Sequence, residues 1–151
     1  MIEQCTTVGH AGWLPMRTAL WPDSSASEHL SEMELFCTRP DRFAQFIAYD
    51  ESRQAIGMIE VALRSDYVNG TSSSPVAFLE GIYVIPAARG RGIARNLVAC
   101  VEQWAVLAGC SELASDAQLD NGPSHAMHRA LGFSETERVV YFRKPLQDNV
   151  T

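Results

Sequence analysis

The chain has 151 residues, of which 46% are hydrophobic and 20% are charged, and its formal net charge is −6. These values fit one globular domain spanning residues 1–151. The acidic charge argues against nucleic acid as the main partner, because phosphate binding needs a basic face, and it is compatible with a cationic substrate. No apolar run approaches the ~20 residues that span a bilayer, so no membrane partner is expected.

The N-terminus lacks the basic start and apolar core of a signal peptide. The four cysteines are scattered and show no C-x-x-C spacing. We therefore expect reduced thiols in a cytoplasmic protein rather than a disulfide framework or a zinc site. His125 and His128 are spaced like a pair of metal ligands, but two histidines without carboxylate support are a weak pattern, and no metal is expected.

The first half of the chain predicts a short strand, two helices and a β-hairpin. The first helix should end before Pro22, and Ser25 with Glu28 forms a capping box for the second helix. Alternating residues predict two strands around the polar turn DESRQ. The expected strands are 2–8, 42–50 and 55–65, and the expected helices are 14–20 and 24–37.

A nearly continuous apolar run, VAFLEGIYVI at 76–85, predicts a central strand buried on both faces. Glu80 and Gly81 interrupt this run, so we expect a β-bulge or a close approach of another segment there. An acidic side chain in such a run is costly to bury unless it has a function.

The second half predicts a helix from Gly92 to Gly109, where apolar residues recur at helical spacing. A short strand should follow at 111–117, and then a helix at 121–133 that Asn121 caps. The segment ERVVYFRKPL, 137–146, predicts a closing strand.

The turn RGRGIA, residues 89–94, lies between the central strand and the following helix. A helix N-terminus presents unpaired amides to anions, and glycines let the backbone approach a phosphate closely. The turn fits neither a Walker loop nor a dinucleotide fingerprint. The alternative interpretation is a solvent-exposed basic turn.

This turn resembles the Arg/Gln-x-x-Gly-x-Gly/Ala signature of the GCN5-related N-acetyltransferases (GNAT). The strand LEGIYVIP and the later ALGF also resemble that fold, and the likeness covers nearly the whole chain. It implies an α/β (α+β) fold with a mixed, mostly antiparallel central sheet that splays between two parallel strands and is flanked by helices. It also implies acetyl-CoA as co-substrate. The implied cofactor contacts are Ile82, Tyr83 and Val84 for pantetheine, Gly90, Arg91, Gly92, Ile93, Ala94 and Arg95 for pyrophosphate, and Asn121.

Five separated segments resemble the aminoglycoside 6'-N-acetyltransferases: LWP, DYVNG, LEGIYV, ELASDA and LGFSETERVVYF. The resemblance implies antibiotic acetylation, and its substrate positions fall on Trp21, Tyr67, Glu80, Asp116 and Glu137. Carboxylates and aromatic walls suit a polyamine sugar. Taken alone, Trp21 could instead be a core anchor, Tyr67 could be loop packing, and Asp116 and Glu137 could be surface carboxylates.

We expect Glu80 to act as general base on the 6'-ammonium, directly or through a water. The amine would then attack the thioester in a ternary complex, with no acyl-enzyme, and the amide of Tyr83 or Val84 would stabilise the oxyanion. His128 occupies the position where many GNAT enzymes carry a tyrosine general acid. It could protonate the leaving thiolate, or the thiolate could leave unaided.

Two rival functions stay open: a peptide or other amine acetyltransferase on the same fold, and a non-catalytic acyl-CoA-binding module. Relatives of this fold often pair, and RVVYFRKPL could serve as an interfacial strand, so a homodimer is expected. The sequence does not reveal which aminoglycosides are preferred.

Overall fold

The computed structural model describes residues 1–148. Within them, five strands form one sheet in the order β1-β2-β3-β4-β5. The first four pair antiparallel, and β5 pairs parallel to β4. The strands are β1 (Ile2–Gln4), β2 (Phe43–Tyr49), β3 (Ala55–Arg64), β4 (Val76–Val84) and β5 (Leu113–Ala114). The helices are α1 (Trp13–Leu20), α2 (Ala26–Thr38), α3 (Ile93–Leu107), α4 (Gly122–Ala130) and the short 3-10 helix η1 (Pro86–Ala88).

The local signals at the helix ends work as predicted. The Ser25 side chain accepts a hydrogen bond from the Glu28 amide, and the Glu28 carboxylate accepts one from the Ser25 amide, which completes the capping box of α2. Asn121 caps α4 through a bond from the Ser124 amide. Gly109, just beyond α3, has φ 89°, a conformation that favours glycine and ends the helix.

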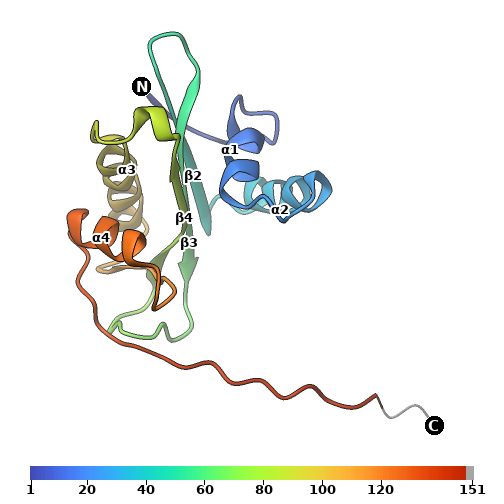
Figure 1. Ribbon diagram of the computed structural model, residues 1–151, viewed down its shortest axis with the longest axis vertical. Helices are drawn as coiled ribbons and strands as arrows, with labels where there is room; N and C mark the ends of the chain where they lie inside the picture. The colour runs from blue at the N-terminus through green and yellow to red at the C-terminus, as the bar shows by residue number, and fades with distance from the viewer. Residues whose placement is uncertain (149–151) are drawn as a thin grey trace.

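The sheet is covered on both faces (Figure 1), with α1 and α2 on one side and α3 and α4 on the other. Alternation along β2 distributes the core accordingly. Ala44, Phe46 and Ala48 pack in the cluster with α3, whereas Ile47 and Tyr49 pack in the cluster with α1 and α2. Burial of both faces explains the nearly continuous apolar sequences of the central strands.

The expected bulge in β4 is confirmed. Glu60 of β3 pairs with Gly81 and Val61 pairs with Leu79, so Glu80 is the extra residue and has no partner across the ladder. Such a bulge bends the strand and re-aims the side chains around it. The interruption of an apolar run by an acid and a glycine was therefore a valid signal for this irregularity.

The parallel pairing of β4 and β5 is short. It joins Ala77 to Leu113 and Phe78 to Ala114, and then ends. Beyond that point β4 continues to Val84 along β3 alone, so the sheet opens into a wedge on the β5 side. This open sheet matches the splayed architecture that the resemblance implies.

The predicted closing strand at 137–146 is wrong for this single chain. Residues 134–148 form no helix or strand, and the segment runs away from the sheet (Figure 1). Phe142 is 92% exposed, and Tyr141 and Val140 are exposed as well. The alternating sequence has the preference of a strand, but a strand also needs a neighbour for its backbone hydrogen bonds, and this segment pairs with none in the described chain. In the same described part, no helix combines the length and apolar composition of a bilayer-crossing segment.

Candidate active site

The glycine-arginine turn forms a backbone cradle at the start of α3. Gly90 and Gly92 both have φ 79°, which side-chain-bearing residues rarely adopt. Gly92 is the N-cap residue and no side chain caps the helix. The amides of the first turn, including those of Ile93 and Ala94, therefore have no helical partner and can bind an anion. A Cβ at Gly90 or Gly92 would meet nothing within 4 Å, so the space around the turn is open.

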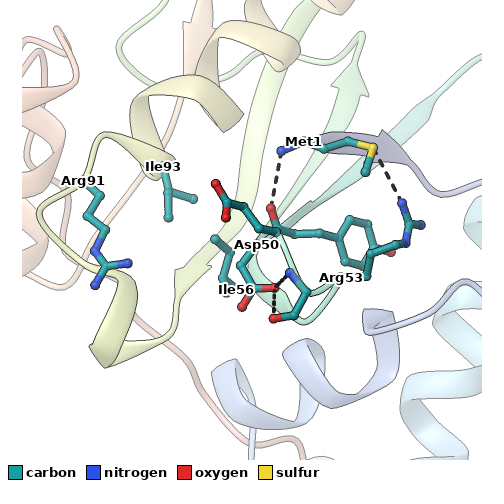
Figure 2. Close-up of a pocket in the computed structure, with 9 residues that line it drawn as sticks. Met1, Asp50, Arg53, Ile56, Arg91 and Ile93 are labelled. Atoms are coloured by element: carbon teal, nitrogen blue, oxygen red, sulfur yellow. Dashed lines mark hydrogen bonds between the residues drawn. The ribbon is translucent and has the colours of Figure 1, made fainter.

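The arginines of this turn differ in role. Arg89 donates through Nε to the Val84 carbonyl at 2.8 Å, and its guanidinium carbon lies 5.7 Å from the Tyr83 ring centroid, so it braces the turn. Arg95 contacts the Ala130 carbonyl at 3.4 Å. Arg91 is exposed and lines an open hollow of about 710 Å³ beside the turn. Figure 2 shows Arg91 and Ile93 on one side of this hollow, facing the β2–β3 turn that carries Asp50 and Arg53.

The backbone of β4 presents alternate amides to the wedge. The Ile85 amide donates to the Ile56 carbonyl of the β3 side at 3.0 Å. Because amides alternate along a strand, that of Tyr83 also faces β3, whereas those of Ile82 and Val84 face the wedge. The Arg89 contact to the Val84 carbonyl agrees with this direction. Of the two expected oxyanion donors, the geometry therefore favours Val84 over Tyr83.

Glu80 lies at the bulge with its carboxylate exposed and paired with Arg64 of β3. Arg64 Nη2 donates to Glu80 Oε1 at 2.8 Å, and the Arg64 guanidinium carbon lies 3.6 Å from the Phe78 ring centroid. The burial cost that the sequence suggests does not arise, because the bulge turns the acid outward. Sequence analysis missed Arg64, since its position 16 residues before Glu80 becomes meaningful only once β3 and β4 pair.

Trp21 lies directly against the bulge. A Cβ built on Gly81 would lie 2.5 Å from Trp21 Cζ2, so the indole fills the space that a side chain there would occupy. Glycine is required at this position by the close approach. The structure thus places Trp21 against the residue that directly follows Glu80 in the bulge.

Asp116 lies across the wedge from Glu80. Both residues are two positions beyond the last β4–β5 pair, Phe78 with Ala114, so they follow the two strands at the point where these separate. Asp116 is exposed.

Tyr67 and Glu137 lie on two segments that meet at Gly70. A Cβ at Gly70 would lie 3.7 Å from Glu137 Cβ and closer still to Thr136, so the 66–75 loop and the start of the C-terminal segment are in contact. Tyr67 is 77% exposed and Glu137 is also exposed. Within the described residues, neither forms a hydrogen bond or an ion pair with Glu80, whose recorded partner is Arg64.

Glu112, just before β5, ties the same loop to the sheet. Its carboxylate accepts hydrogen bonds from the Ser73 hydroxyl and from the Ser72 amide, the latter at 2.9 Å. These bonds lower the pKa of Glu112. The loop that carries Tyr67 is therefore fixed at its C-terminal end by an ionised acid.

The α4 residues are engaged within the chain. His128 Nδ1 lies 2.7 Å from the Ser124 carbonyl, which can only accept, so Nδ1 carries a proton; Nε2 lies 2.7 Å from the Ser115 hydroxyl and accepts from it when the ring is neutral. In the neutral ring Nε2 therefore has no proton to give to a thiolate. His125 contacts the Gln118 carbonyl at 2.8 Å. The described residues contain no group of three or more His, Cys, Asp or Glu side chains arranged to hold a metal ion.

Comparisons with known proteins agree with this geometry. The profile of the Acetyltransferase (GNAT) family matches residues 13–133. An aminoglycoside N(6')-acetyltransferase type 1 of Acinetobacter genomosp. 13 is 57% identical over 134 residues, which cover 89% of this chain and 90% of that protein. Its counterpart from Serratia marcescens is 50% identical over 146 residues, covering 97% and 99%.

Two solved structures also resemble this chain closely. The apo aminoglycoside 6'-N-acetyltransferase AAC(6')-IG from Acinetobacter haemolyticus has a TM-score of 0.90 and 48% identity, with 97% of this chain and 99% of that one covered. AAC(6')-Iy in complex with the bisubstrate analogue CoA-S-monomethyl-acetylneamine has a TM-score of 0.90 and 43% identity, covering 97% and 98%. The chain therefore belongs to the acetyltransferase (GNAT) family and, within it, to the aminoglycoside 6'-N-acetyltransferases.

Proposed function

We propose that this chain transfers the acetyl group of acetyl-CoA to the 6'-amino group of aminoglycosides in a ternary complex. The observation that carries the proposal is the juxtaposition at β4, where an anion cradle follows the strand and a carboxylate stands at its bulge. The similar AAC(6')-Iy, solved with a CoA-acetylneamine bisubstrate analogue, supports both substrates. Because acetyl-CoA is made inside cells, we place the reaction in the cytoplasm.

Acetyl-CoA binding uses the cradle and the exposed backbone of β4. The pyrophosphate would contact the backbone of residues 90–95 with Arg91 nearby, and the pantetheine arm would run along the wedge-facing edge of β4, where the Ile82 amide can donate to it. The Tyr83 amide faces β3, so Tyr83 would support the acetyl-CoA site as part of the strand and not by donating a hydrogen bond to the cofactor. Asn121 caps α4 through Oδ1, which leaves its amide nitrogen as the donor toward the cofactor.

Glu80 is the proposed general base. It removes a proton from the 6'-ammonium, directly or through a water, and the nitrogen lone pair then attacks the thioester carbonyl carbon. The Val84 amide faces the wedge and would stabilise the resulting oxyanion. When the tetrahedral intermediate collapses, the nitrogen gives its second proton to solvent, the C–S bond breaks, and the sulfur leaves as the thiolate. We assign no general acid to this step, since His128 Nε2 is engaged by the Ser115 hydroxyl at 2.7 Å.

The test is an acetyl-CoA assay that follows release of the free thiol. Neomycin and paromomycin form a matched pair of acceptors, since they differ in an amine or a hydroxyl at the 6' position. Turnover of neomycin without turnover of paromomycin is the expected result. Turnover of peptide amines alone would support the rival acetyltransferase, and acetyl-CoA binding without turnover would support a non-catalytic module.

Asp116 and Glu137 are expected to contribute to affinity rather than chemistry. Replacing Asp116 by Asn or Glu137 by Gln removes one negative charge from the proposed acceptor site, so the KM for neomycin should rise about 3- to 10-fold at low salt, with kcat little changed. The difference from wild type should shrink as salt is raised, because exposed charges are screened. Steady-state kinetics at 20 and 300 mM salt measures this. A loss that is confined to kcat would contradict the assignment.

We also propose a homodimer in which the C-terminal segment of each copy adds a strand to its partner. Residues 139–142 (VVYF) are exposed in the isolated chain, and an exposed apolar run of this kind marks an interaction surface. Among the described residues, β5 has a neighbour on one side only, and the lining of a groove of about 270 Å³ beside it includes Leu113, Leu131 and Phe133. An edge strand with an adjacent apolar groove is a template for strand addition.

Deleting residues 139–151 should convert the protein from dimer to monomer, because the added strand is lost while Glu137 is kept. Sedimentation equilibrium measures the mass of both forms. The point variant Phe142→Asp, which keeps the full length, should weaken the dimer in the same direction, whereas Leu146→Asp, beyond the apolar run, should have a smaller effect. A monomeric wild type, or a truncated chain that stays dimeric, would overturn this assembly.

A further inference from the structure

A charged cluster is buried beneath Trp21, between α1, α2 and the sheet. Arg17 is 1% exposed, and it donates through Nη1 to Glu60 Oε1 of β3 at 2.5 Å. Trp13 Nε1 donates to the other oxygen, Oε2, at 2.8 Å. Arg17 also pairs through Nη2 with Glu32 at the surface. Both carboxylate oxygens of the buried acid thus have a donor.

The same guanidinium reaches Trp21 through His29. Arg17 Nε donates to His29 Nδ1 at 3.2 Å, so Nδ1 is the acceptor and Nε2 carries the proton. His29 Nε2 then donates to the Trp21 carbonyl at 3.1 Å. The Trp21 amide in turn donates to the Arg17 carbonyl at 2.8 Å, and the Arg17 guanidinium carbon lies 4.8 Å from the Trp21 ring centroid. Trp21 is therefore held at its amide, its carbonyl and its ring by two residues.

The far side of the indole rests on the bulge that carries Glu80. Trp21 Cζ2 and Cη2 lie 2.5 and 2.6 Å from the position of a Cβ on Gly81. Gly81 is also the ladder partner of Glu60. The acid that anchors Arg17 and the glycine that receives Trp21 are thus opposite one another on neighbouring strands, one residue from the proposed base.

Packing alone does not require these charges. Desolvating a guanidinium costs several kcal/mol, and a buried ion pair can often be replaced by apolar residues without loss of stability. An apolar side chain cannot donate a hydrogen bond. Here Arg17 donates to His29 and His29 donates to the Trp21 carbonyl, and this contact fixes the backbone from which the indole extends. A shift of about 1 Å in a wall of a site can change turnover ~100-fold.

We propose that Arg17 and His29 are positioning residues that fix the Trp21 ring against Gly81 as the acceptor-facing wall beside Glu80. The inference rests on the proposed function, because it concerns how the acceptor is oriented. It assigns a role in aminoglycoside selection to two buried residues that touch neither substrate.

The test compares His29→Leu, which removes both hydrogen bonds, with His29→Gln, which keeps a donor and an acceptor. His29→Leu should raise the KM for neomycin about 10-fold while leaving the KM for acetyl-CoA unchanged, and His29→Gln should restore most of the loss. In a Trp21→Ala background, His29→Leu should add no further change, because its effect passes through Trp21. Wild-type turnover in the same assay tests the proposed function separately.

A purely structural role gives a different pattern: a lower melting temperature with both KM values unchanged, or effects of His29→Leu and Trp21→Ala that add. Either result overturns the proposal. Should His29→Leu not fold, Gly81→Ala displaces the indole from its other side, since the methyl group would overlap Trp21. It should produce the same selective rise in the KM for neomycin, and an unchanged KM would overturn the proposal as well.

Discussion

Replacing Glu80 by Gln is expected to lower kcat with neomycin by about 10²- to 10³-fold, the usual contribution of a general base. The amide matches the carboxylate in size and can still accept the hydrogen bond from Arg64, so the bulge should keep its shape. It cannot take up a proton from the ammonium. The dissociation constant for acetyl-CoA, measured by calorimetry, should stay within 2-fold of wild type because the backbone cradle at 90–95 is untouched.

Two further variants sharpen this experiment. Glu34→Gln changes the same charge at an exposed position on α2 and should leave kcat unaltered. Glu80→Asp keeps the carboxylate on a side chain that is one methylene shorter. Partial activity is expected if a water relays the proton across the added distance. Wild-type kcat in Glu80→Gln would remove Glu80 as the base and leave the ammonium to be deprotonated by solvent.

The elements that the sequence predicted well are those with a local cause. The capping box at Ser25 and Glu28 depends on residues three apart, and the β4 bulge on adjacent residues that a buried strand does not tolerate. The glycine turn before α3 was also predicted from local sequence, because Gly90 and Gly92 supply a conformation that other residues avoid. Each of these signals acts within one turn or one strand and needs no tertiary partner.

The features that the sequence did not predict depend on pairing between distant segments. Arg64 meets Glu80 only through the register of β3 and β4, and Arg17 meets Glu60 across 43 residues. The predicted strand at 137–146 failed for a related reason. Alternation reports a preference for extended backbone, but it does not say whether the neighbouring strand belongs to the same chain.

The resemblance to the family named the remaining site residues, and the structure adds distinctions among them. Trp21 lies against Gly81, the residue after Glu80, while the loop that carries Tyr67 contacts the segment that carries Glu137 at Gly70. Alternation of amides separates Val84 from Tyr83, which motif position alone treated as equivalent. An acceptor that spans both groups of residues would have to reach from the wedge to the 66–75 loop.

The largest expected change in stability follows from Glu60→Ala. Burial raises the pKa of the Glu60 carboxyl. The positive charge of Arg17 and the hydrogen bonds that Arg17 and Trp13 donate to the carboxylate oppose this rise. Without this acid, the Arg17 guanidinium stays buried and keeps only one of its buried hydrogen-bond partners, His29. The Trp13 N–H loses its acceptor. Removing one partner of a buried ion pair costs about 3–5 kcal/mol, which for a chain of this size lowers the melting temperature by about 10 °C.

Chemical and thermal unfolding of matched variants measures this change. Glu34→Ala, which removes the same charge from an exposed position of α2, should stay within about 0.5 kcal/mol of wild type. Glu60→Gln keeps an acceptor and should lose less than Glu60→Ala. Adding Arg17→Met to Glu60→Ala should recover part of the loss, because the unpaired cation is then removed. A Glu60→Ala variant as stable as wild type would mean that Glu32, at the surface end of the cluster, suffices to compensate Arg17, and that the buried acid does not anchor α1 to β3.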